Sequence, residues 1–396
     1  MDFNWGGNLL NSLITSLVRV AFFGATALGK ALGLVWVVGT GTVWVHAEPV
    51  PLSYAENFSI DRYDTHSIVT VRNPWRGAGQ KSFVYALVPR GKALPGLPAT
   101  ARLIRVPIQR LSLMETVYLS HVEALGLYEQ LIGLAHVELA SDERTRARVI
   151  SGDTKRIQAS GALDIESLML LRSDAIFTSA MGNPQFDVHP QLERAGQPVV
   201  VTAEYMEAHP LGRSEWIKFT AAFFGMDYEA EALFDRISYR YNELLSLAQG
   251  LSDRPRVLAN APFGGVWHVP GGRSFTARSI ADAGGEYVFS DDRSTGGVPK
   301  DFESVYLKAG KADVWLHPGT ARTLDELFGV DERFQRFEAF GKGRIYNNTF
   351  RLGPGGLNEI WERAVLHPEE ALADLIAILH PRLLPGHSFY YYEQLK

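Results

Sequence analysis

Two glutamates occupy matching positions in two short stretches that nearly repeat each other. The stretch DIESL at 164–168 and the stretch DFESV at 301–305 each precede a turn and an apolar run typical of a buried strand. An acidic residue early in a helix is stabilised by the helix dipole. We therefore predict two similar α/β lobes, with Glu166 exposed on the first and Glu303 on the second. Such a pair of carboxylates suits docking on a symmetric, basic partner.

A second group of candidate residues follows the predicted strands. Ligands of open α/β sheets bind at the carboxyl ends of the strands. Aromatic side chains supply apolar area and arginines bind oxygen anions through two nitrogens, so this set suits a bulky metal complex. For each aromatic residue, packing in a core is the competing explanation, and for each arginine it is a solvated surface charge. The candidates are Met114, Glu115, Tyr118, Met181, Asn183, Tyr205, His209, Phe263, Trp267, His268, Arg273, Phe350 and Arg351.

Direct binding of a metal ion or haem in the same region is an alternative. His209, His268, His317, Glu204 and Glu207 offer imidazole and carboxylate groups, which transition metals accept. The chain has no His-rich loop and no HExxH pair, so a structural role is the better explanation for each histidine taken alone. No resident metal and no cofactor are expected.

An enzyme is the third possibility, since two-lobed α/β folds of this kind also occur in chelatases that insert metal. The sequence contains neither a Walker A loop nor a GxSxG elbow. No carboxylate pair or histidine triad has a spacing that catalysis would need. We therefore expect no catalytic residues and a protein that is not an enzyme.

Composition places the chain among globular proteins. Of its 396 residues, 46% are hydrophobic and 21% are charged, which is enough for two domains with a sizeable core. The net charge is −5 and no basic stripe is present, so nucleic acid is not an expected partner. The absence of cysteine excludes disulfides, thiolate metal sites, a cysteine nucleophile and a bacterial lipoprotein anchor.

The first 47 residues are typical of a targeting segment. An apolar run follows Lys30 and ends at Val45-His46-Ala47, a cleavage pattern of small residues. We predict a signal peptide over 1–47 and a periplasmic mature chain. An uncleaved membrane anchor is the alternative, although Lys30 interrupts the apolar span and leaves it short for a membrane helix.

The remaining chain divides into four predicted parts. Within the first part, residues 68–71 and 83–88 predict a β-hairpin. Residues 105–113 predict the first strand of the first lobe, and a break near Gly225 is expected between two connecting helices. The parts are an N-terminal extension at 48–100, an N-terminal lobe at 101–210, connecting helices at 211–250 and a C-terminal lobe at 251–396.

Four features from about Arg102 to the end, read in order, resemble the periplasmic substrate-binding proteins of ABC importers for ferric siderophores and vitamin B12. Ser173 stands where that family usually has proline. The features are the apolar helix 117–125 closed by Gly126, the stretch 163–168 before 173–176, the glycine pair within 281–286, and the stretch 302–305 before 312–314.

This resemblance implies a fold, a ligand and a partner. The fold is two Rossmann-like lobes joined by a long helix, with small hinge motion, a cleft between them and here an N-terminal β-hairpin extension. The ligand is a small-molecule metal complex, either an iron–siderophore or a corrinoid. The partner is an ABC permease dimer in the inner membrane, whose arginines would pair with Glu166 and Glu303. We expect the protein to act as a monomer.

Overall fold

The computed structural model describes residues 47–159, 162–353, 356 and 358–396. Two units separate by their contacts, residues 1–48 and the compact unit 49–396. All but the last residue of the predicted signal peptide lie outside the described residues. In the described part, no helix is long and apolar enough to cross a membrane.

The first lobe is built on a parallel sheet with the strand order β12-β11-β6-β7-β8. Starting from β6, the chain moves outward to β7 and β8, then returns to place β11 on the other side of β6. The order therefore reverses between β6 and β11, and such a switch point is where open α/β sheets bind ligands. The strands are β6 (Leu111–Leu113), β7 (Leu131–Leu134), β8 (Lys155–Arg156), β11 (Ala175–Ser179) and β12 (Val199–Thr202).

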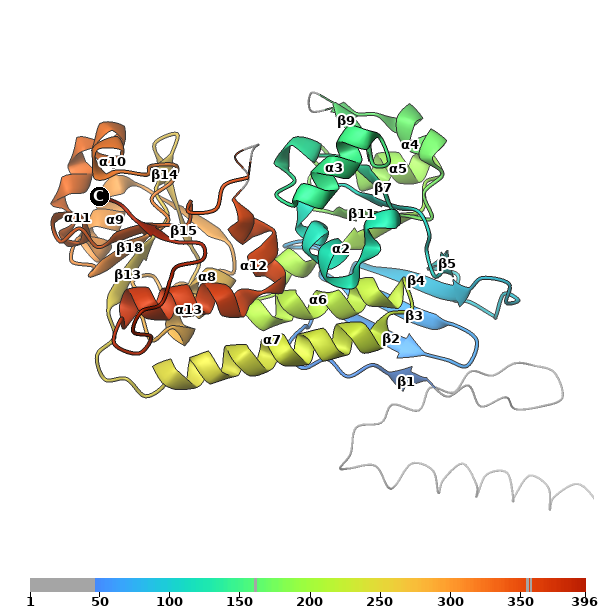
Figure 1. Ribbon diagram of the computed structural model, residues 1–396, viewed down its shortest axis with the longest axis horizontal. Helices are drawn as coiled ribbons and strands as arrows, with labels where there is room; N and C mark the ends of the chain where they lie inside the picture. The colour runs from blue at the N-terminus through green and yellow to red at the C-terminus, as the bar shows by residue number, and fades with distance from the viewer. Residues whose placement is uncertain (1–46, 160–161, 354–355, 357) are drawn as a thin grey trace, which may run out of the picture. The chain divides into compact units, whose positions relative to one another are not determined.

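Helices cover this sheet, and its central strands are almost wholly buried, as parallel strands between two helical layers must be (Figure 1). The predicted helix ending at Gly126 is confirmed, and Gly126 adopts φ +67°, the left-handed conformation that glycine tolerates best. The helices are α2 (Leu119–Leu125), α3 (Glu143–Ser151), α4 (Ile165–Leu171) and α5 (His189–Arg194).

The second lobe has the strand order β16-β13-β18-β19-β20, in which β20 alone is antiparallel. Its order reverses between β13 and β18. The elements are β13 (Arg256–Ala259), β16 (Glu286–Tyr287), β18 (Val314–Leu316), β19 (Ile345–Asn347), β20 (Glu393–Gln394), α8 (Phe275–Asp282), α9 (Phe302–Ala309), α10 (Leu324–Val330), α11 (Glu338–Gly341), α12 (Arg363–Leu366) and α13 (Pro368–Leu379).

The second lobe also carries a small antiparallel sheet that the sequence did not predict. It consists of β14 (Pro262–Phe263), β15 (Val266–Pro270) and β17 (Gly297–Lys300). Trp267 of β15 is fully buried and packs against Trp315 with ring centroids 5.6 Å apart. This sheet is thus fixed to the core of the lobe by an aromatic cluster.

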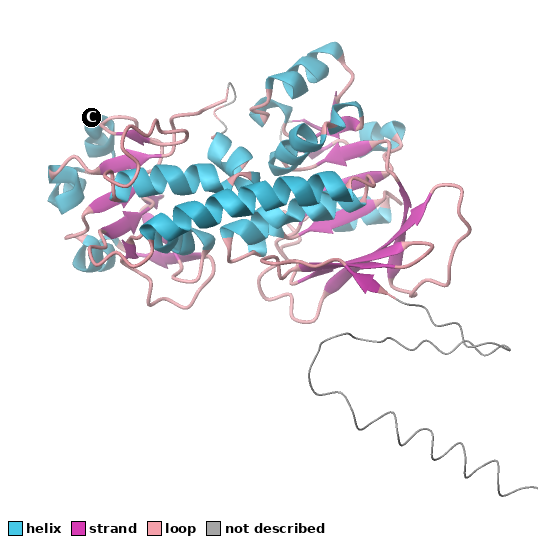
Figure 2. Ribbon diagram, turned by 60° about the horizontal axis from the view of Figure 1, so that its bottom comes forward, coloured by secondary structure: helices cyan, strands magenta, loops and turns pink. Residues whose placement is uncertain are grey.

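The predicted break between the connecting helices is confirmed. Helix α6 (Pro210–Ala222) ends before Gly225, which has φ +68°, and α7 (Asp227–Ala248) follows. Helices α6 and α13 both pack against α7. Figure 2 shows the connecting helices side by side in the layer that joins the two lobes. The predicted fold class, two Rossmann-like lobes joined by helices, is confirmed.

The N-terminal extension forms a sheet of its own. The predicted hairpin is confirmed, since β3 (Ser67–Arg72) pairs antiparallel with β4 (Ser82–Pro89), and β2 (Phe58–Arg62) pairs with β3. The single strand predicted over 105–113 is wrong. Strand β5 (Ala101–Val106) pairs with β4, and the chain leaves this sheet at Pro107, which has no N–H to donate, before β6 begins.

Candidate ligand-binding site between the lobes

A cavity of about 420 Å³, here called the cleft cavity, lies between the two lobes. In the first lobe, its lining consists of residues that follow the carboxyl ends of β11 and β12. In the second lobe, its lining consists of the start of α8 and the loop before β17. A turn of the N-terminal extension adds Arg76. The lining residues are Arg76, Met181, Tyr205, Met206, Glu207, Ala208, Phe275, Thr295 and Gly296.

A second cavity of about 630 Å³, the α8 cavity, shares Glu207 and Ala208 with the cleft cavity. One wall is the outer face of α8 and the other is the N-terminal segment at Tyr54 and Glu56. The predicted residues His209 and Arg273 line it. His209 accepts a hydrogen bond at Nδ1 from the Leu211 N–H (3.0 Å), which orients its ring at the start of α6.

A cluster of titratable side chains occupies the switch point of the first lobe. Glu115, which follows β6, accepts hydrogen bonds from the N–H (2.9 Å) and hydroxyl (3.0 Å) of Ser179. Its Oε2 atom is buried without a partner in the described residues. Burial, helped by the negative charge of Glu204, raises the pKa of Glu115 to about 7. Glu204 in turn accepts a hydrogen bond from the Tyr118 hydroxyl (2.7 Å).

Arg213 on α6 is a cation that lies close to Glu204 and Tyr118 of this cluster. Burial lowers the pKa of its guanidinium, and the nearby Glu204 opposes that shift. Its guanidinium lies over the ring of Phe275 at 4.7 Å, and Phe275 lines the cleft cavity. Through Phe275, the guanidinium of Arg213 lies directly behind the lining of the cleft cavity.

Three of the predicted ligand residues lie in the core instead. Met114, Tyr118 and Trp267 are 3%, 2% and 0% exposed, so they have no free surface for a ligand. Met114 follows the buried strand β6, Tyr118 ends the short 3-10 helix after it and packs on Phe177, and Trp267 of β15 packs on Trp315. For these three residues the prediction is corrected: they are part of the packing that supports the site.

Five other candidates lie outside the linings of the two cavities. Asn183 closes a turn by accepting a hydrogen bond at Oδ1 from the Gln185 N–H. Phe263 is 87% exposed, and His268 on β15 is also exposed. Phe350 is exposed as well, and the Arg351 guanidinium stacks on Tyr390 at 3.8 Å. Met181, Tyr205, His209 and Arg273 are therefore the predicted residues that line these cavities, and Glu115 lies at the switch point outside both linings.

Residues that sequence reasoning missed come mostly from the extension and from α8. Arg76 belongs to a turn whose composition indicates only a change of direction, and Phe275 begins a helix whose apolar face predicts burial. Thr295 and Gly296 come from a polar loop with no pattern. Only the topology, which brings this loop opposite the first lobe, identifies them.

The histidines and carboxylates proposed as metal ligands do not converge. His209 lines the α8 cavity, His268 lies on β15, and His317 follows β18, where its Nε2 lies 2.7 Å from the Tyr392 hydroxyl. The one group of metal-binding geometry found in the described residues is His367, Glu369 and Glu370. Glu370 is already engaged there, as it accepts hydrogen bonds from Arg363 (2.8 and 3.1 Å).

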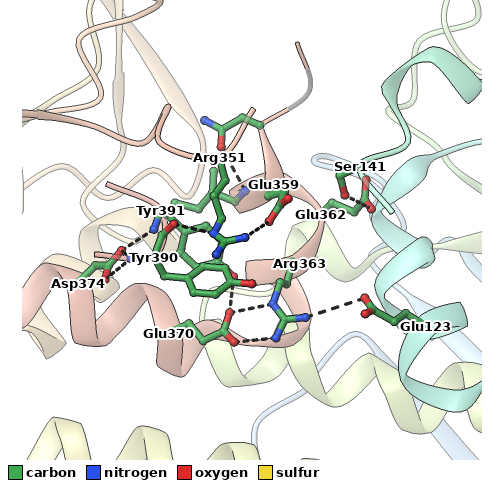
Figure 3. A network of polar contacts seen from close by, with 12 residues as sticks. Glu123, Ser141, Arg351, Glu359, Glu362, Arg363, Glu370, Asp374, Tyr390 and Tyr391 are labelled. Atoms are coloured by element: carbon green, nitrogen blue, oxygen red, sulfur yellow. Dashed lines mark hydrogen bonds and ion pairs between the residues drawn. The ribbon is translucent and has the colours of Figure 1, made fainter. Parts of the chain in front are cut away.

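A polar network on α12 joins the lobes on another face (Figure 3). The Ser141 hydroxyl of the first lobe donates to Glu362 (2.6 Å), and Arg363 pairs with Glu123 of α2 at 3.9 Å. Burial raises the pKa of Glu362 to about 7. These contacts connect α12 and the residue before it with the first lobe.

The two glutamates of the repeat lie at equivalent places on α4 and α9. Each helix is capped by the preceding aspartate, since Asp164 accepts from the Ser167 N–H (2.9 Å) and Asp301 from the Ser304 N–H (2.7 Å). Glu166 and Glu303 are both exposed, one residue into the helix. Neither lines the cleft cavity or the α8 cavity.

Comparison with known proteins identifies the fold. An uncharacterized lipoprotein of Methanocaldococcus jannaschii is 25% identical over 86% of this chain and 84% of its own length. A possible iron-binding, periplasmic solute-binding protein of Staphylococcus epidermidis is 17% identical with a TM-score of 0.54, over 69% of this chain and 98% of that one. A periplasmic heme binding protein of Pseudomonas aeruginosa is 20% identical with a TM-score of 0.54, over 73% and 98%.

A family model supplies the assignment that the fold alone does not. The model of the periplasmic binding proteins matches residues 114–352, which contain the main sheets of both lobes except the strands β6 and β20. The resemblance seen in the sequence is confirmed: the chain belongs to the periplasmic binding protein family.

Proposed function

We propose that the protein is the solute-binding component of an ABC importer and that it carries an iron–siderophore complex in the cleft cavity. A corrinoid is the alternative cargo of the same class. The observation that carries the proposal is the position of the cavity, at the carboxyl ends of the strands of the first lobe and facing the second lobe. Sites for small molecules commonly have volumes of about 300–1,000 Å³, and the cleft cavity lies in that range.

The chemistry of the lining suits an anionic metal complex with an apolar rim. Met181, Tyr205 and Phe275 offer apolar and aromatic surface. Arg76 in this cavity and Arg273 in the α8 cavity offer guanidinium groups, which bind carboxylate or catecholate oxygens in a bidentate manner.

Titration of the purified protein tests this proposal. Quenching of tryptophan fluorescence would be followed on addition of a ferric tris-catecholate, a ferric hydroxamate, haemin or cyanocobalamin, with the iron-free siderophores as controls. We expect saturable one-to-one binding of a ferric complex with Kd of about 1 μM or tighter. Equal binding of the iron-free siderophore would contradict selection of the metal complex.

Haem is a second candidate cargo, because a solved heme-binding protein shares the fold over 73% of this chain. A histidine ligand for its iron would come from His209, which lines the α8 cavity, or from His268. Loss of the haemin Soret shift in His209→Ala or His268→Ala would support this alternative. Direct binding of a bare metal ion is less well supported, since the proposed ligands do not converge. Chelatase activity, the third candidate, would require turnover of a tetrapyrrole with a metal.

We propose further that Glu166 and Glu303 dock on the two subunits of a permease dimer. Both lie at the start of a capped helix, and in both helices the residues three and four positions later are exposed and apolar. One face of each helix therefore offers a carboxylate beside an apolar pair, which suits a symmetric partner with basic and apolar contacts. These pairs are Met169 and Leu170, 52% and 82% exposed, and Tyr306 and Leu307, 38% and 89% exposed.

The place of action follows from the same proposal. A solute-binding component acts outside the cytoplasmic membrane, and residues 1–47 would direct secretion and be cleaved. The archaeal relative is named a lipoprotein, whereas this sequence contains no cysteine to carry a lipid. Mass spectrometry of the mature protein from its host tests cleavage near Ala47, and a retained segment would favour an anchor.

A further inference from the structure

We propose that the N-terminal extension forms a third wall of the cleft and that Arg76 contacts an anionic group of the cargo, a carboxylate or a catecholate oxygen. This inference rests on the binding function proposed above. It assigns a contact to a part of the chain that precedes the residues matched by the family model.

Part of this chain lies outside the fold that it shares with the solved structures. The Staphylococcus protein is matched over 98% of its length but covers only 69% of this chain. The match with the archaeal relative covers 86% of this chain. Residues 114–396 make up less than three quarters of this chain, so the match must also include residues of the extension. At least part of the extension is therefore included in the match with the archaeal relative.

Buried carboxylates hold the beginning of the extension against α6. Glu215 accepts hydrogen bonds from the backbone N–H groups of residues 53–55, at 2.8–3.1 Å. Glu207 accepts from the N–H groups of residues 56 and 57 and from Trp216 Nε1 (3.0 Å). Breaking such bonds would leave buried charges unpaired, so the extension is fixed to the helices that join the lobes.

The turn between β3 and β4 is then fitted onto the first lobe. The Trp75 ring occupies the space where a side chain at position 182 would lie, and Gly182 has φ +74°. The Tyr205 hydroxyl lies 2.6 Å from the Ala180 carbonyl oxygen and 3.2 Å from that of Pro74. Tyr205 thus connects the carboxyl end of β11 with the turn.

Arg76, the next residue of this turn, reaches the second lobe. Its guanidinium occupies the space beside Gly296 that any larger residue would fill, and both residues line the cleft cavity with Thr295. No hydrogen bond or ion pair to Arg76 is formed by the residues that the structure describes. Two other arginines of the α8 cavity are engaged: Arg278 pairs with Asp282, and Arg254 donates to the carbonyls of Ala281 and Gly285.

An exposed guanidinium at the mouth of a cavity, held by a rigid turn, is suited to an oxygen anion. The acid closest to it in the lining is Glu207, whose oxygens are already bonded to backbone N–H groups and Trp216. Because the turn is fixed to the first lobe while Arg76 contacts the second, a cargo anion bound to Arg76 would be held where the three parts meet.

The first test measures whether the turn lies against the second lobe in solution. The chain has no cysteine, so an Arg76→Cys, Thr295→Cys double variant can be treated with a short bismaleimide that reacts only at these two positions. An Arg105→Cys, Thr295→Cys variant is the matched control, because Arg105 bonds to the loop at residues 89 and 92 in the same sheet. Cross-linking of the first pair only is expected. If the 76/295 pair does not cross-link, or cross-links no more than the 105/295 control pair, the inference is overturned.

The second test measures the contact with cargo. Haemin, which carries propionate carboxylates, and a ferric tris-catecholate are titrated into wild type, Arg76→Glu, Arg76→Lys and the control Arg105→Glu. For whichever probe the wild type binds, we expect Arg76→Glu to raise Kd by about tenfold or more and Arg76→Lys to raise it less. The control Arg105→Glu should bind that probe with a Kd within about twofold of wild type.

The outcomes separate the two proposals. Wild-type affinity in Arg76→Glu, with binding by wild type intact, overturns the role of Arg76 and leaves the proposed function standing. Failure of the wild type to bind any probe overturns the proposed function and this inference with it, whatever the cross-linking shows. Thermal unfolding of each variant verifies that a weaker affinity does not come from loss of the fold.

Discussion

The two lobes are alike on their outer helices and different at their switch points. Helices α4 and α9 begin with the same capped pattern, carry Glu166 and Glu303 at the same position and expose an apolar pair one turn later. Inside, the first lobe places Glu115 after β6, whereas the second places His317 after β18. Burial raises the pKa of Glu115 to about 7 and lowers that of His317 to about 4.

The similar outer helices and the different switch points suit the different partners that we propose for these two surfaces. A symmetric partner requires the same contact twice, so the outer surfaces repeat. A single asymmetric cargo requires different groups on its two sides, so the inner surfaces need not repeat. One outer feature also differs: Glu303 pairs with Arg333 at 3.3 Å, while no ion pair of Glu166 is found among the described residues.

The largest expected effect concerns the repeated outer surface. A Glu166→Lys, Glu303→Lys double variant should lower uptake of cargo in cells by about tenfold or more, because both docking contacts become repulsive to a basic partner. Cargo affinity of the purified variant should stay within about twofold of wild type, since neither residue lines a cavity.

Matched charge reversals on other helices provide the control. Glu143 on α3 and Glu332 are exposed acids at helix starts, one in each lobe, so Glu143→Lys with Glu332→Lys changes the net charge equally. This control should transport normally. Normal uptake by the Glu166/Glu303 variant would remove the docking role and with it the meaning of the repeat.

The second effect concerns the buried groups and has opposite signs in the two lobes. The folded pKa of Glu115 lies above its ordinary value of 4.5, so its contribution to stability falls as pH rises from about 4.5 to 7. The folded pKa of His317 lies below its ordinary value of 6.5, so its contribution falls as pH drops from about 6.5 to 4. Glu115→Gln should therefore stabilise the protein at pH 8, by on the order of 2 kcal/mol.

Urea unfolding of wild type, Glu115→Gln and His317→Gln at pH 4.5 and pH 8 measures these contributions. His317→Gln should gain stability relative to wild type at pH 4.5 and not at pH 8. Parallel changes of both variants with pH would show that the inner groups do not differ as described.

A third effect distinguishes how the extension contacts the two lobes. Gly182→Ala should lower the free energy of unfolding by about 1–2 kcal/mol more than Gly264→Ala. Both glycines have positive φ, but a side chain at Gly182 would meet the Trp75 ring, while Gly264 has open space around it. Equal costs for the two variants would mean that the turn is not packed on the first lobe. Thermal or urea unfolding measures the difference.

The smallest effect concerns the ion pair between Glu303 and Arg333, which has no counterpart at Glu166 among the described residues. Arg333→Ala should leave the free energy of unfolding almost unchanged, because exposed ion pairs are screened by water and salt. It should leave uptake unchanged or increase it slightly by freeing Glu303. A loss of uptake comparable to that of the double reversal would show that Arg333, and not Glu303, makes the contact with the permease.

Much of the fold was predictable from the sequence because local signals and tertiary structure agree. The repeated Asp-x-Glu-Ser starts, Gly126 and the break at Gly225 each specify a local conformation that the fold uses. The strand predicted over 105–113 failed because apolar residues occur on both sides of Pro107, and only the pairing of β5 with β4 shows that the first half belongs to another sheet.

The site was less predictable, for a physical reason. Residue type says that Trp267 and Tyr118 are large and aromatic, but whether they meet a ligand or a neighbour depends on which face of the sheet is covered. Arg76 is distant in sequence from every other cleft residue, so its place in the lining depends on contacts such as those with Gly182 and Gly296.

The most direct test of the account is a titration of the purified protein with a ferric siderophore complex, followed by tryptophan fluorescence and by native mass spectrometry. Saturation at one complex per chain, at Kd of about 1 μM or tighter and with no binding of the iron-free siderophore, is predicted. Absence of saturable binding for every complex tried, haemin and cyanocobalamin included, would contradict a cleft that carries a metal complex.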